Sequence, residues 1–280
     1  MSAKKMKTST PHDKVFPMRA AFAFTILATC LAPIGATLAN DSTADLAAGG
    51  ITLLKSDGIT MKSEDLAISV DEVKVRYVFR NETATPITTT VAFPLPVFEE
   101  LDEDEGGPDL PFDMKAKNPM GFKVTVDGKN MAYKTKVEKQ GKQVQTTYFW
   151  TQTYPPNQDV IVEHRYRPGA GGFITPTDKY PSPELDKELT NTYCVGPKLL
   201  PAIKKNETFA RTVQYILKSG ANWKGPIGQF KLTLIKANEK DKISLCESDT
   251  RKASPTTFII ERKDFTPTND LRILFLPATK

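Results

Sequence analysis

Histidine is scarce in this chain, and its scarcity excludes several kinds of catalytic site. The 280 residues include two histidines, three cysteines and two tryptophans. His12 lies in a segment that we expect to be removed on export, which leaves His164 alone in the mature protein. A zinc site with two histidine ligands is therefore excluded, and a Ser-His-Asp triad would have to use His164. Because His164 shares a predicted strand face with Val162 and Tyr166, we expect it to be a hydrogen-bonded, half-buried residue of the sheet.

The common catalytic motifs are missing as well. The sequence has no Gly-x-Ser-x-Gly elbow, no Walker loop and no dinucleotide fingerprint. We therefore expect no catalytic residues, no cofactor and no bound metal. A carboxylate-dependent hydrolase stays open as an alternative, because it needs only two acids at the right separation. Glu138, Asp159 and Glu163 are the acids nearest to an ordered strand context, and the sequence does not distinguish them from surface charges.

The first 39 residues have the three parts of a secretory signal peptide. A positive stretch from Lys4 to Arg19 precedes an apolar run over 20–32, and Thr37–Ala39 places small residues just before a cleavage point. We expect the mature chain to begin near Asn40 and to be periplasmic or secreted. The apolar run is too short to span a bilayer comfortably, so we expect no integral membrane segment after cleavage.

Most of the net positive charge belongs to this signal. The whole chain has 38 basic and 33 acidic residues, and the signal contains five of the former and one of the latter. The mature chain is left with a net charge of about +1, and a nucleic-acid partner is not supported.

Two cysteines remain after cleavage, Cys194 and Cys246. In an oxidising compartment we expect them to form a structural disulfide. The third cysteine, Cys30, follows Thr29 in a segment that resembles a lipoprotein cleavage box. Thr29 stands where that box has Gly, Ala or Ser, so lipidation of Cys30 is the less favoured alternative.

Alternating apolar and polar residues dominate the mature chain, as in Val73–Phe79, and no long helix is predicted. We predict an all-β fold of two β-sandwich-like units in series, with the disulfide in the second unit. The predicted divisions are 1–39 for the signal peptide, 40–168 for the first sandwich, 169–190 for a linker and 191–280 for the second sandwich. A short helix is expected within 197–205.

Two loops are candidate binding surfaces. The acidic stretch 99–105 is expected to be a solvated loop, with a calcium site as the alternative. The segment Gly220–Gly228 contains Asn222, Trp223 and Lys224 as a candidate recognition loop. The competing interpretation is that Trp223 packs at the end of a sandwich.

Several segments in one order resemble a known family. They are Asp65–Asn81, Val162–Pro168, Tyr193–Cys194, Gly220–Gly228, Cys246 and Ser254–Phe258. Together they are similar to family 4424 of the domain-of-unknown-function series (DUF4424), found in exported proteins of Gram-negative bacteria. The resemblance implies export and brings no catalytic residues. The first half is also faintly similar to the vault protein inter-alpha-trypsin domain, which implies a β-sandwich.

These features favour a non-enzymatic binding or scaffolding protein of the cell envelope, with an envelope protein as partner. The alternatives are a carrier of an apolar small molecule, such as a lipid, and the hydrolase described above.

Overall fold

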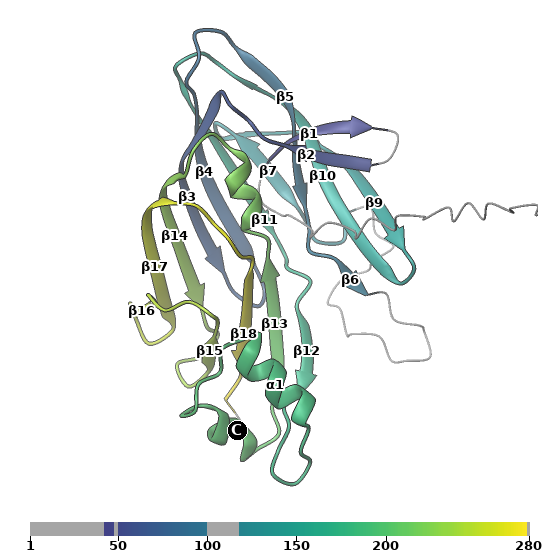
Figure 1. The fold of residues 1–280 in the computed structure, drawn as a ribbon, viewed down its shortest axis with the longest axis vertical. Helices are drawn as coiled ribbons and strands as arrows, with labels where there is room; N and C mark the ends of the chain where they lie inside the picture. Colours follow the sequence, from purple (N-terminus) through teal and green to yellow (C-terminus); the bar gives the residue numbers. More distant parts are fainter. Residues whose placement is uncertain (1–41, 48–49, 100–117, 279–280) are drawn as a thin grey trace, which may run out of the picture. The chain divides into compact units, whose positions relative to one another are not determined.

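The protein consists mainly of β-strands, which confirms the predicted all-β class (Figure 1). The computed structural model describes residues 42–47, 50–99 and 118–278. The predicted signal peptide with Cys30 lies outside these residues, as does all but Glu99 of the acidic stretch 99–105. Within the described ranges no helix is long and apolar enough to cross a membrane.

One eight-stranded sheet, called here the large sheet, takes strands from both halves of the chain. In spatial order it contains β16 (Arg251–Lys252), β17 (Thr257–Phe265), β14 (Ile227–Ile235), β3 (Ile59–Ile68), β4 (Val73–Asn81), β11 (Asp159–Tyr166), β7 (Lys123–Val126) and β8 (Lys129–Asn130). The connection between the two halves is the parallel pairing of β14 with β3, which places Leu232 opposite Leu66. Strands from before and after the predicted linker therefore share one sheet, and the described residues form one compact unit.

Two smaller sheets complete the fold. The six-stranded sheet contains β2 (Gly50–Leu54), β1 (Ser42–Ala47), β5 (Ile87–Pro94), β10 (Gln143–Tyr154) and β6 (Phe98–Glu99), with β9 (Lys134–Gln140) also paired to β10. The four-stranded sheet contains β12 (Gly171–Ile174), β13 (Phe209–Tyr215), β18 (Leu271–Leu276) and β15 (Lys242–Ser244). Buried side chains from all three sheets belong to one hydrophobic cluster. The two sandwich-like units therefore share the large sheet as a common layer.

Contacts between aromatic side chains show which strands each small sheet covers. Phe93 of β5 contacts Tyr166 of β11, with ring centroids 5.5 Å apart. Tyr215 of β13 lies against β4, where its hydroxyl is 2.9 Å from that of Tyr77. The six-stranded sheet thus packs near β11, and the four-stranded sheet packs near β4. Burying each such ring stabilises the fold by about 1.5–3 kcal/mol.

Local sequence patterns explain the strands and the tightest turn. Alternate residues of β4 are buried, from Val73 through Phe79, while those between them are half-buried or exposed. Asp127 and Gly128 join β7 to β8 with φ angles of +48° and +75°. These positive values suit a two-residue hairpin turn, as the Asp-Gly dipeptide predicts.

The predicted linker 169–190 contains regular structure instead. It holds β12 and most of helix α1 (Pro183–Asn191), a nine-residue helix that was not predicted from the sequence. Ser182 caps α1, because its side-chain oxygen accepts a hydrogen bond from the Leu185 amide. The expected short helix is confirmed as α2 (Leu200–Lys204). Both helices contribute apolar side chains to a second cluster against the four-stranded sheet.

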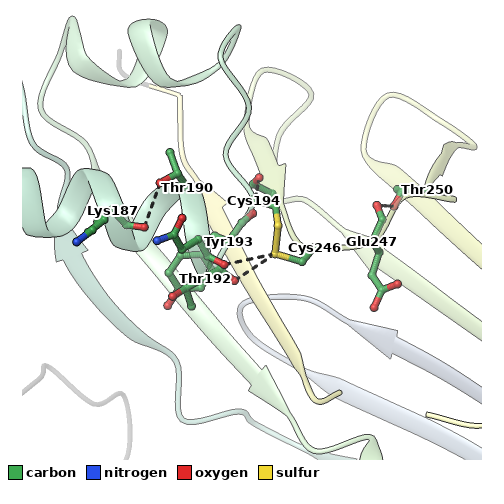
Figure 2. The surroundings of a disulfide bond; sticks show 10 residues. Lys187, Thr190, Thr192, Tyr193, Cys194, Cys246, Glu247 and Thr250 are labelled. Atoms are coloured by element: carbon green, nitrogen blue, oxygen red, sulfur yellow. Dashed lines mark hydrogen bonds between the residues drawn. A yellow bond between two sulfur atoms is a disulfide. The ribbon is translucent and has the colours of Figure 1, made fainter. Parts of the chain in front are cut away.

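The predicted disulfide is confirmed between Cys194 and Cys246, with Cα atoms 5.0 Å apart (Figure 2). It joins the segment after α1 to the segment after β15. The same two segments are held by the Ser244 hydroxyl, which donates to the Tyr193 carbonyl at 2.8 Å. The disulfide therefore fixes α1 to the edge strand of the four-stranded sheet.

Candidate functional site

His164 lies inside the core, which corrects the expectation of a half-buried residue. Its side chain is 2 % exposed and is surrounded by aromatic rings, with the centroid of Phe93 at 4.6 Å and that of Trp150 at 5.4 Å. Burial lowers the pKa of His164 to about 3, so the imidazole is neutral at physiological pH. A side chain in this position does not reach a ligand at the protein surface.

The buried acids of the described chain belong to separate networks. Glu64 of β3 is 1 % exposed and accepts a hydrogen bond from the Tyr215 hydroxyl at 3.1 Å. Asp241 accepts from the backbone amides of Asn238 and Ala278. Each carboxyl group therefore stabilises its own part of the fold.

The three acids considered for hydrolysis lie beside cations. The carboxylate of Asp159 accepts hydrogen bonds from Arg80 at 2.9 Å and from Lys62 at 3.1 Å. These two bonds lower the pKa of Asp159 although partial burial raises it. The carboxylate of Glu138 is 3.2 Å from Lys136, and that of Glu163 is 3.9 Å from Arg76. Among the described residues no group of three or more His, Cys, Asp and Glu is arranged to hold a metal ion.

The predicted recognition loop is only partly at the surface. Trp223 is 1 % exposed and packs against Phe79, with ring centroids 4.4 Å apart. Asn222 is half-buried, and its carbonyl accepts from the Ser56 amide at 2.7 Å. Lys224 is exposed. A recognition role for this loop stays a prediction, and in this arrangement it would depend on Lys224, because the indole ring belongs to the core.

The outer face of the large sheet, opposite the core, carries an ordered row of charges. Five residues in register on neighbouring strands alternate in sign. We call them the alternating row: Glu163, Arg76, Asp65, Lys231 and Glu261. Opposite charges on adjacent strands attract one another, and Glu163 pairs with Arg76 and Asp65 with Lys231. The third acid, Glu261, pairs with Arg251 of β16, so each acid of the row has a cationic partner.

The next row along the same face has one sign only. Lys123 of β7, Arg165 of β11 and Lys74 of β4 lie directly opposite one another, and we call them the cationic row. Glu72 is the counterion of two of them, since Lys74 lies 2.7 Å from one carboxylate oxygen and Arg165 bonds to the other. Partial burial raises the pKa of Glu72, but the bonds from Lys74 and Arg165 outweigh it and the pKa is lowered. Within the described residues Lys123 forms no ion pair.

A hollow of about 420 Å³ lies over the cationic row. Its walls come from five strands, β3, β4, β11, β7 and β8. Besides the cationic row they include Asp65, Arg76 and Glu163 of the alternating row and the polar residues Thr125 and Asn130. A second hollow of about 380 Å³ shares Lys123 and Arg165 with the first. The volumes are in the range of small-molecule sites, and both hollows are open to solvent.

This site could not be identified from the sequence. Lys74 and Arg165 alternate with buried residues, so alternation alone puts them on the outward faces of β4 and β11. The missing information was the register, because only the pairing of β7, β11 and β4 brings Lys123 beside them.

One family model matches most of this chain. The family model described as "Domain of unknown function (DUF4424)" matches residues 39–144 and 137–274. The chain belongs to this family. A comparison with curated proteins finds no match.

Among solved structures, a protein of Legionella pneumophila described as a "putative nutrient binding protein" is similar in fold. The alignment has a TM-score of 0.51 and 18 % identity, and it covers 86 % of this chain and 72 % of the Legionella chain. Yeast LTA4 hydrolase aligns with a TM-score of 0.39 and 8 % identity over 78 % of this chain and 28 % of its own. The E323A mutant of an M1 zinc metallopeptidase of Deinococcus radiodurans aligns with a TM-score of 0.27 and 12 % identity. That alignment covers 80 % of this chain and 44 % of the metallopeptidase chain.

Proposed function

We propose that this protein is an exported, non-enzymatic binding protein of the cell envelope that holds its ligand or partner on the outer face of the large sheet. The observation that carries the proposal is the cationic row within the larger hollow. Three cations lie side by side on adjacent strands, and one carboxylate, that of Glu72, pairs with two of them, Lys74 and Arg165. The acids of the neighbouring row of the same face are each paired with a cation.

The cationic row is an energetic cost to the fold. Like charges directly opposite on neighbouring strands destabilise a sheet, and opposite charges contribute roughly 0.2–1 kcal/mol per pair. Because the row is not explained by stability, an anionic group that occupies the hollow is its simplest explanation.

The positions of the titratable groups favour binding over catalysis. His164 is enclosed by aromatic rings, and the buried acids Glu64 and Asp241 belong to separate networks. The name of the Legionella neighbour refers to binding, and at 18 % identity it adds only a similar fold. Export rests on the N-terminal sequence pattern.

Affinity purification of the mature protein from its own envelope tests this proposal. Mass spectrometry would identify both co-purifying proteins and molecules extracted with organic solvent. The test variant is Lys74→Gln with Lys123→Gln, and the matched control is Lys231→Gln with Arg251→Gln. Each pair removes two positive charges from the large sheet, and the control pair lies outside the hollow.

We expect wild type and control to retain the same stoichiometric component and the test variant to lose it. Equal recovery by all three proteins would contradict binding at this face, as would a wild-type sample with nothing bound. Fractionation and N-terminal sequencing would check export, with a mature chain that begins near Asn40 as the expected result.

A further inference from the structure

The charge and width of the cationic row define the kind of anion that would fit it. We infer that the hollow over Lys74, Lys123 and Arg165 is a site for a dianionic phosphate group, an inference that rests on the proposed binding function.

The first argument is charge balance. Three cations and the one carboxylate of Glu72 leave two positive charges at the row. The two acids of the alternating row that line the hollow are already paired, Asp65 with Lys231 at 3.4 Å and Glu163 with Arg76 at 3.9 Å. A phosphate monoester has a charge of about −1.5 to −2 at neutral pH, which matches this excess, whereas a carboxylate has only one negative charge.

The second argument is size. The cationic row crosses three neighbouring strands, and strands lie about 4.8 Å apart, so its three Cα positions span roughly 10 Å. That width suits one phosphate group between the side chains and is short for a polyanion. The alternating row limits the positive surface on one side, so a longer acidic chain would meet Glu163 and Asp65.

The third argument concerns the donors. Arg165 presents a planar guanidinium and Lys74 and Lys123 present ammonium groups, which are the usual phosphate-binding side chains in proteins. Thr125 and Asn130 line the same hollow and carry hydroxyl and amide donors. Phosphate oxygens accept several hydrogen bonds at once, so mixed donors around one hollow suit them.

Calorimetric titration of the mature protein with inorganic phosphate at low salt tests the inference. We expect binding by the wild type, and binding weaker by at least about tenfold by the Lys74→Gln and Lys123→Gln double variant, because two charge-assisted contacts are lost. The Lys231→Gln and Arg251→Gln control should bind within about twofold of wild type. Flotation with phosphatidic acid vesicles, compared with phosphatidylcholine vesicles, then separates a lipid headgroup from a soluble phosphate compound.

Each outcome decides the matter. Binding of phosphate alone assigns a soluble phosphate compound, and binding of phosphatidic acid vesicles as well assigns a lipid headgroup. If neither phosphate nor phosphatidic acid vesicles bind, the phosphate assignment is overturned. It is also overturned if the test variant and the control variant bind phosphate equally weakly, because the attraction is then unspecific. If phosphate fails while the test variant still loses its envelope component, the binding function stands and only the ligand class falls.

Discussion

Replacing Trp223 by alanine measures how much the Gly220–Gly228 segment contributes to the core. The indole is 1 % exposed, and it contacts Phe79 at 4.4 Å and Tyr154 at 6.2 Å between ring centroids. Truncating a buried aromatic side chain removes its burial energy and leaves a cavity, which together cost about 3–5 kcal/mol. For a chain of this size that corresponds to a fall in melting temperature of roughly 6–20 °C.

Urea denaturation of the mature protein measures this change directly, with Lys224→Ala as the control. Lys224 is adjacent and exposed, so its substitution should change the free energy of unfolding by no more than about 0.5 kcal/mol. A Trp223→Ala variant as stable as the Lys224→Ala variant would refute the packing argument. It would then favour a surface role for the indole.

Three further predictions concern the disulfide, the buried histidine and the cationic row. Replacing Cys194 by serine should lower the free energy of unfolding by about 4 kcal/mol, because the bond to Cys246 closes a loop with a sequence separation of 52. Urea denaturation under oxidising conditions measures this change. An unchanged denaturation midpoint would contradict the prediction. The pKa of His164 is about 3 in the folded protein and about 6.5 in the unfolded chain. The stability that comes from keeping this imidazole neutral is therefore complete above pH 6.5 and is lost as the pH falls toward 3. Between pH 7 and pH 5 the wild type should lose about 2 kcal/mol more than His164→Gln, and parallel pH profiles for the two proteins would be the contrary result. Lys123→Gln should leave stability unchanged or raise it by up to about 1 kcal/mol, since it removes repulsion by Arg165, and a clear loss of stability would show that the lysine supports the sheet.

Local patterns in the sequence were sufficient for strands such as β4, for the tight turn after β7 and for the disulfide. Alternation along Val73–Phe79 identifies the buried face of β4, and Asp127 with Gly128 supplies the positive φ angles of a tight hairpin. Two cysteines in an exported chain have one simple pairing, which is the one observed.

Helix α1 was missed although its start signal is present. Ser182 followed by Pro183 and Glu184 is a good helix start, with a capping side chain, a proline in the first turn and an acid near the amino end. The helix is nine residues long and buries only Leu189, so it has almost no apolar periodicity. The surrounding prolines favoured the linker interpretation instead.

The pairing of strands that are far apart in the chain could not be predicted from the sequence. The parallel pair of β3 and β14 joins residues about 165 positions apart, and no turn or local pattern encodes it. The same limit hid the depth of His164, whose face was known but not the sheet that covers it. It also hid the cationic row, which exists only through the register of three strands.

The most direct test of the binding account is to map where a ligand contacts the protein. Inorganic phosphate would be added to isotope-labelled mature protein, and backbone amide shifts would be followed by NMR. The account predicts saturable shifts concentrated in β4, β7 and β11 around Lys74, Lys123 and Arg165, with little change near Lys231. Saturable shifts centred elsewhere, or no shifts at all, would contradict the assignment of this face as the binding site.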